Sequence, residues 1–70
     1  MEEALTWENT YEIVRALRDQ FPSVKLEEVS LGMIFHMTLA LPQFHDNPEL
    51  ANDAILSEIY REWYEEVNPL

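Results

Sequence analysis

The side chains of this sequence that could take part in chemistry are carboxylates and two histidines. Fourteen acidic residues stand against four basic ones, which gives a formal charge of -10. Carboxylate oxygens suit hard cations, but exposed carboxylates bind them weakly where no loop makes them converge. The same groups can attract a basic protein surface, raise the association rate and orient the partner. The residue types therefore predict weak cation binding or recognition of a basic partner.

Two groups of residues are candidates for these roles. We expect partner binding at an acidic row in and just before the first predicted helix and in the last one: Glu8, Glu12, Asp19, Glu49 and Asp53. We expect any weak, exchangeable metal binding at a second set: His45, Asp46, Glu49 and Asp53. A single His beside a single Asp does not make a metal site, and a row of acids can also be a solvated helix face. His36 lies in an apolar run, which favours a structural role.

The composition argues against several classes of function. Nucleic-acid and anionic-membrane binding rely on Lys and Arg, and residues 30–50 contain neither, so a DNA-binding winged helix is disfavoured. Without cysteine the chain cannot hold an iron-sulfur cluster by thiolate ligation or accept persulfide sulfur. No Ser/His/acid constellation is present, so we expect no enzyme. An acyl carrier protein needs an Asp-Ser-Leu motif, whereas Ser30 follows Val29.

Length and hydropathy predict one small folded domain. Seventy residues allow a single core, and 47% hydrophobic residues are enough to form it. No segment reaches the roughly 20 apolar residues of a membrane span, and nothing in the sequence suggests export. We therefore expect a cytoplasmic monomer consisting of one domain over residues 1–70, with a core over 5–66 and frayed ends.

The elements that must position the acids are helices at both ends of the chain. Residues 9–20 have apolar side chains at helical spacing, with Asn9 as the expected cap and Glu12 in a capping box. Pro22 ends this helix because it disfavours helical conformation at Phe21. Trp7 and Trp63 are expected to lock the chain ends into the core, with a partner for each buried indole N-H.

The last helix is predicted over residues 48–66, with Asn47 as its cap and Pro48 at its first position. Its apolar stripe includes Ile55, Ile59 and Trp63. The middle segment stays open, because residues 33–41 fit the alternation of a strand and the spacing of a helix equally well. Residues 26–29 suggest a short helical turn.

These residues resemble the IscX family, the small acidic accessory proteins of iron-sulfur cluster assembly. The resemblance begins with Leu5-Thr6-Trp7 and covers about residues 5–66. Its most specific part is the register L-x-x-F-x-D-x-P-x-x-x-N-x-x-I-L-x-x-I-x-x-x-W-x-x-E, which starts at Leu41 and continues to Glu66 without a gap.

The resemblance implies a mainly α, modified winged-helix fold of about four helices, with a second helix near residues 31–40 capped by Ser30. It also implies an adaptor that binds the cysteine desulfurase, competes there with frataxin, binds ferrous or ferric iron weakly and so modulates sulfur delivery. The iron-sulfur scaffold or ferredoxin are further expected partners. No tightly bound cofactor is expected.

The sequence departs from the family pattern at three places. His45-Asp46-Asn47 stands where the family has a run of aspartates, so the loop carries a single acid. Ile34-Phe35 replaces the frequent Met-His pair, with His36 one position later, and Lys25-Leu26 replaces Asp-Pro. These differences bear on iron binding and on the start of one helix, whereas the apolar spacing of the fold is kept.

Overall fold

Helix α1 (Thr10–Gln20) forms where the spacing of its apolar residues predicts it. The computed structural model describes residues 4–68. The helix ends at Gln20, with Phe21 as its C-cap just before Pro22, as expected. The predicted capping box is wrong, because Asn9 makes no side-chain hydrogen bond to the first turn. Its Oδ1 instead accepts from the Thr6 backbone N-H at 2.9 Å and from the Thr6 hydroxyl at 3.1 Å, which fixes the turn that enters the helix.

The ambiguous middle segment is a helix. A 3-10 turn, η1 (Leu26–Glu28), precedes helix α2 (Leu31–Leu39). Ser30 caps α2, since its Oγ accepts from the Met33 backbone N-H at 3.1 Å. Ile34 and Thr38, one helical turn apart, are the residues that α2 buries completely. A strand would have placed alternate residues on this face, so packing of a helical face against the rest of the core decides the conformation.

The last helix begins five residues later than predicted. Asn47 and Pro48 open only a 3-10 turn, η2 (Pro48–Leu50), and helix α3 (Asp53–Val67) follows. Asn52 is the cap, and its Oδ1 accepts from the Ile55 backbone N-H at 2.9 Å. Two asparagines compete for the same role, and the second forms the helix because the buried stripe starts only after it, at Leu56.

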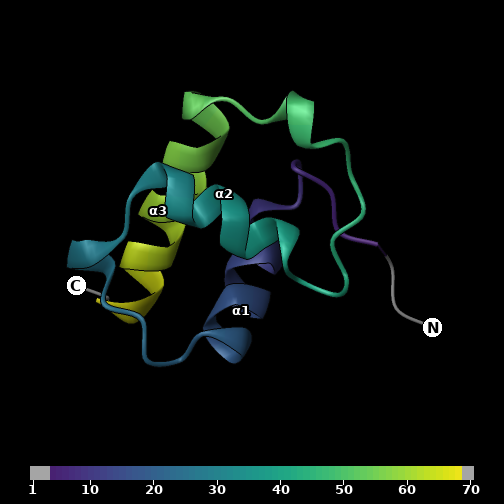
Figure 1. The fold of residues 1–70 in the computed structure, drawn as a ribbon. Coiled ribbons are helices and arrows are strands. Elements are labelled where there is room, and N and C mark those ends of the chain that lie inside the picture. The colour runs from purple at the N-terminus through teal and green to yellow at the C-terminus, as the bar shows by residue number, and fades with distance from the viewer. Residues whose placement is uncertain (1–3, 69–70) are drawn as a thin grey trace.

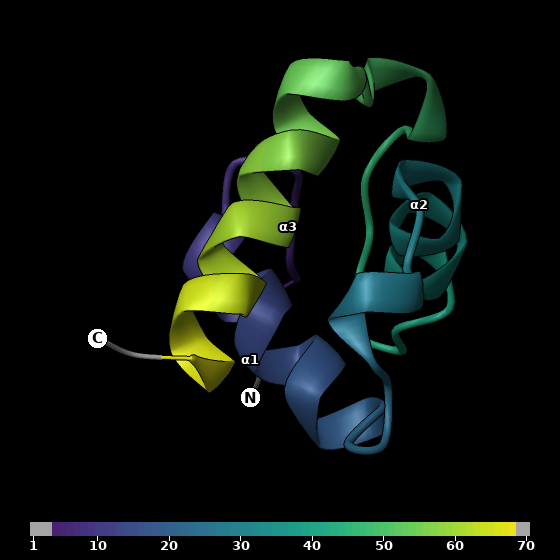
Figure 2. The ribbon, with the colours of Figure 1, turned by 90° about the vertical axis from the view of Figure 1, so that its left-hand side faces the viewer.

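One apolar core joins the three helices. Helix α1 packs mainly against α3, and α2 packs against α3 and, less extensively, against α1 (Figures 1 and 2). The fully buried side chains come from all three helices: Ile13, Val14, Leu17, Ile34, Thr38 and Ile59. The Tyr60 hydroxyl donates to the Leu26 carbonyl at 3.1 Å and so ties α3 to η1. Trp63 is 2% exposed, which confirms its expected burial in the core.

The fold class is mainly α, as expected, but two details of the expectation are not supported. Residues 4–68 contain three α-helices, and the two other regular elements are the single 3-10 turns η1 and η2. Within those residues there is no strand, and β-pairing is limited to one isolated bridge between Leu5 and Phe44. A wing needs paired strands, so the winged-helix likeness is not supported. The expected frayed ends include residues 1–3 and 69–70, which lie outside the described residues.

Candidate functional site

The loop that the sequence analysis put forward for metal binding holds the N-terminal segment in place. Asp46 uses both carboxylate oxygens: one accepts from the Trp7 backbone N-H at 3.0 Å, and the other from the Asn47 N-H at 2.7 Å. The Trp7 indole N-H donates to the Asn47 carbonyl at 2.9 Å, which supplies the partner expected for a buried indole. Two backbone bonds of Leu5, to Gln43 and His45, continue the contact. Asp46 is therefore a structural anchor.

Aromatic packing strengthens this anchor. The Trp7 ring stacks parallel to Phe35 with centroids 6.1 Å apart and meets Phe44 edge to face at 4.6 Å. Trp7 is only 4% exposed. Aromatic pairs at such separations add about 0.5–1.5 kcal/mol beyond the area they bury. The segment before α1 is thus fixed by hydrogen bonds and by packing, and Glu8 has a defined position on the surface.

The structure does not gather the expected metal ligands. In residues 4–68, no three His, Asp or Glu side chains come close enough together to hold a metal ion. His45 is exposed, but its neighbour Asp46 already serves two backbone donors. Glu49 lies in η2 and Asp53 in the first turn of α3, both exposed. Cation binding at this end of the molecule would therefore rely on separate, solvated carboxylates.

The five acids expected to bind a partner are all exposed but do not form one row. The bonds from Trp7 to Asp46 and Asn47 bring Glu8 to the same end of the molecule as Glu49. Asp19 lies at the opposite end of α1, where Arg18 reaches Glu66 of α3 at 3.0 Å. Between them, Arg15 interrupts the acidic face of α1, since it is one turn from both Glu12 and Asp19.

The densest run of acids in the structure is on α3 and was not among the site residues predicted. Glu58 and Glu65 are exposed, Glu62 and Glu66 are half-buried, and Arg61 pairs with Glu58 at 3.1 Å. The helical spacing of these acids was visible in the sequence. The sequence also showed Arg15 and Arg18 in the first helix, and these two cations leave α3 as the more acidic helix.

Residues 5–68 match the family model described as "Iron-sulphur cluster assembly". The chain belongs to this family. The match spans nearly all of the described residues and agrees with the IscX register from Leu41 to Glu66. For this IscX-family protein, membership makes iron-sulfur cluster assembly the relevant process and places its partners within that pathway. In residues 4–68, none of the helices has the length and apolar character needed to cross a bilayer.

Proposed function

We propose that this IscX-family protein is a non-enzymatic adaptor that binds the cysteine desulfurase of the assembly system and modulates sulfur delivery. The observation that carries the proposal is the combination of the family match with a charge of -10 on a chain that has no cysteine. Such a protein has no thiol to carry sulfur or hold a cluster. It acts through the proteins that do, and it competes with frataxin for the same desulfurase surface.

Glu8, Glu12 and Glu49 are the acids proposed to dock first. All three are exposed, and the anchor formed by Trp7, Asp46 and Asn47 fixes Glu8 relative to Glu49. A fixed arrangement of charges costs less conformational entropy on binding than a flexible one. Electrostatic attraction of this kind acts mainly on the association rate and weakens as salt is added.

Iron is proposed to bind weakly, as an exchangeable modulator. The chain offers oxygen ligands in abundance, but those of residues 4–68 do not converge in groups of three or more. Hard cations need several oxygen ligands at once for tight binding. Ferrous iron would therefore bridge the acidic surface and its partner, or screen the negative charge of that surface. It would do so without a permanent site.

The test is isothermal titration of the protein into the desulfurase at low and high salt, with and without ferrous iron under anaerobic conditions. We expect salt-sensitive binding with a dissociation constant of the order of micromolar, about -8 kcal/mol. The variant Glu8→Lys/Glu12→Lys/Glu49→Lys should bind at least about tenfold more weakly. A change in affinity on adding iron supports the modulator role, and an unchanged affinity removes iron from the proposal.

A matched variant separates the named surface from net charge. Glu27→Lys/Glu58→Lys/Glu65→Lys reverses the same number of charges on η1 and α3, and it should keep the affinity within about threefold. If this variant loses binding and the first does not, the docking surface is on α3. If wild-type protein does not bind even at low salt, the desulfurase is not its partner.

A further inference from the structure

Two segments outside the α-helices hold each other in place. The first, here called the strap, is residues 4–8 before α1, and the second, here called the connecting loop, is residues 42–52 between α2 and α3. Four hydrogen bonds join them: Leu5 N-H to the Gln43 carbonyl at 2.8 Å, His45 N-H to the Leu5 carbonyl at 3.0 Å, Trp7 N-H to Asp46, and the Trp7 indole N-H to the Asn47 carbonyl. Within residues 4–68, the strap makes its other hydrogen bonds in the local turn from Thr6 to Asn9, so the connecting loop supplies all of its distant polar contacts.

Each of the two segments contributes one buried side chain to the core. Trp7, at 4% exposed, is the buried residue of the strap, and Phe44, at 7%, is the buried residue of the connecting loop. The η2 part of the loop lies on the surface, where Leu50 is 56% exposed. The side chains of residues 4–68 that are buried completely all belong to α1, α2 or α3. Separation of the strap from the connecting loop thus uncovers two aromatic side chains and leaves the centre of the helical core intact.

The strap and the connecting loop depend on each other more than a helix depends on its neighbours. Within a helix each backbone bond is made inside the element, whereas the strap loses its distant bonds as soon as the connecting loop moves away. Segments with few buried contacts and with backbone hydrogen bonds near the surface open at lower free energy than a packed core. Because neither segment keeps its bonds alone, we expect the two to open together.

The two segments also carry two of the acids proposed to dock the desulfurase. Glu8 lies on the strap and Glu49 on the connecting loop, and both are exposed. Their relative position is fixed only while the strap and the connecting loop stay in contact. A basic surface that contacts Glu8 and Glu49 together therefore binds the closed arrangement more tightly than the open one.

We propose that the strap and the connecting loop form a latch, which opens as one unit while the three helices stay folded and which a basic partner docked on Glu8 and Glu49 holds closed. The open latch exposes Phe44 and the face of Phe35 on which Trp7 stacks. Partner binding stabilises the closed latch, and closure in turn favours binding, because the coupling between two equilibria is reciprocal. The opening is a property of the free protein, whereas its control by a partner rests on the proposed docking of the desulfurase.

Hydrogen exchange of the ¹⁵N-labelled full chain, followed by NMR under conditions in which reclosing is faster than exchange, tests the opening. We expect the backbone amides of Leu5, Trp7 and His45, here called the latch amides, to share one protection factor within about twofold. That factor should lie at least about tenfold below the protection of amides in the middle of α1 and α3. Equal protection of the latch and the helices would overturn the proposal, because the latch would then open only with the whole protein.

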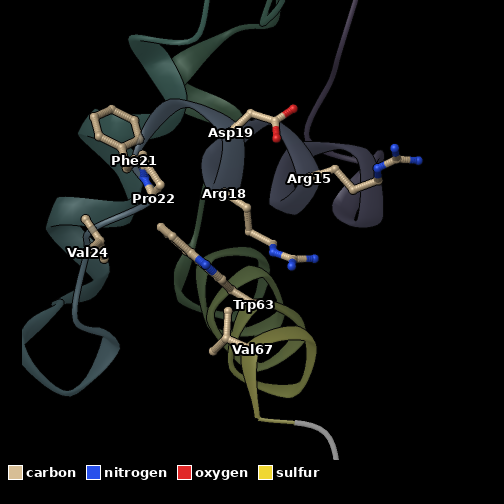
Figure 3. Close-up of a pocket in the computed structure, with 8 residues that line it drawn as sticks. All are labelled: Arg15, Arg18, Asp19, Phe21, Pro22, Val24, Trp63 and Val67. Atoms are coloured by element: carbon tan, nitrogen blue, oxygen red, sulfur yellow. The ribbon is translucent and has the colours of Figure 1, made fainter.

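A substitution in the helical core separates latch opening from global unfolding. Leu17 is fully buried in the last turn of α1, at the opposite end of that helix from the strap. Its neighbour Arg18 lines a hollow between the C-terminal ends of α1 and α3 together with Trp63 (Figure 3). Leu17→Val removes one buried carbon and weakens the helical core whether the latch is open or closed. The protection of the helix amides should therefore fall about fourfold, while that of the latch amides should change less than about twofold. An equal fall in both would overturn the proposal.

Trp7→Phe is the matched variant on the latch itself. It removes the indole donor from the Asn47 carbonyl, a bond that only the closed latch makes. The protection of the latch amides should fall at least about fivefold. Unchanged protection would mean that these amides do not exchange through separation of the strap from the connecting loop, which would also overturn the proposal.

The control by a partner is tested with the cysteine desulfurase itself. With free desulfurase at about 100 times its dissociation constant, hydrogen exchange followed by mass spectrometry should show latch peptides exchanging at least about tenfold more slowly than in the free chain. Binding seen by calorimetry without this added protection would overturn the coupling and leave the desulfurase as the partner. Absence of binding by calorimetry would overturn the proposed function and the coupling with it, while exchange in the free chain would still decide whether the latch opens.

Discussion

At the scale of single residues, the polar groups inside the protein differ in how well they are satisfied. Asp46 makes two hydrogen bonds to backbone donors, whereas the hydroxyl of Thr38, a fully buried residue of α2, has no partner among residues 4–68. A buried polar group without a partner costs about 1–3 kcal/mol, while an apolar group of the same shape avoids that cost. Removing the side-chain polar group should therefore stabilise the protein at Thr38 and destabilise it at Asp46.

Replacing Thr38 with Val should stabilise the protein. The substitution keeps the branched shape and removes the unpaired hydroxyl, so we expect the free energy of unfolding to rise by about 1 kcal/mol in urea titrations. Thr38→Ser is the matched control, because it keeps the hydroxyl and deletes a buried methyl group, and it should destabilise by about 1 kcal/mol. A destabilised Thr38→Val protein would mean that the hydroxyl has a partner after all.

Removing the Asp46 carboxylate should loosen the N-terminal segment. Asp46→Ala leaves the Trp7 backbone N-H without its acceptor, and we expect a loss of about 1–3 kcal/mol in unfolding free energy together with a changed tryptophan fluorescence spectrum. Glu49→Ala removes the same charge from an exposed side chain nearby and should cost less than about 0.5 kcal/mol. Equal effects of the two substitutions would contradict the anchoring role.

At the scale of elements, the start of α3 depends on which asparagine caps it. Asn47 accepts from the Glu49 backbone N-H at 3.0 Å and supports only one 3-10 turn, whereas Asn52 supports fifteen residues of helix. The cap residue satisfies an N-H that the helix itself leaves unpaired. Loss of the cap should therefore lower the free energy of unfolding in proportion to what the following element contributes to the core. That contribution is far larger for α3 than for η2.

The substitution Asn52→Ala should accordingly cost about 1 kcal/mol of stability, and Asn52→Asp should restore most of it. Asn47→Ala should have a smaller effect, because η2 buries none of its own residues. Thermal unfolding followed by circular dichroism would rank the three variants. Should Asn47→Ala prove the more destabilising, the helix would in effect start at η2, as the sequence alone suggests.

At the scale of the whole molecule, the net charge of -10 opposes the compact state. The described residues hold two ion pairs, Arg18 with Glu66 and Arg61 with Glu58, and exposed pairs of this kind contribute little. Repulsion among carboxylates on one small surface then outweighs local attraction. Salt should therefore stabilise this protein, although salt weakens individual ion pairs.

We expect the melting temperature to rise by about 5 °C, equivalent to about 1 kcal/mol, when sodium chloride increases from about 20 mM to about 500 mM. Calorimetry or circular dichroism would measure the shift. The variant Glu58→Gln/Glu65→Gln carries two fewer negative charges on α3 and should show a smaller rise. A melting temperature that fell with salt would indicate that the ion pairs dominate and that the carboxylates are far enough apart not to repel.

The sequence by itself determined the two long helices, the buried tryptophans and the family, because these depend on residues close together or on a fixed spacing of residue types. Helical periodicity over eleven or more residues identifies the face that packs. The match over residues 5–68 confirms the family assignment made from the same spacing. The exposure of all five candidate acids likewise followed from their positions off the apolar stripes.

Only the tertiary structure decided the remaining features, because each depends on residues far apart in the chain. Residues 31–39 are helical because packing of the Ile34 and Thr38 face selected between two local patterns of equal quality. Asp46 became an anchor because Trp7, thirty-nine residues away, supplies the donor. Arg18 and Glu66 form an ion pair because the C-terminal ends of α1 and α3 meet. Local sequence sets what each residue can do, and packing sets which residues act together.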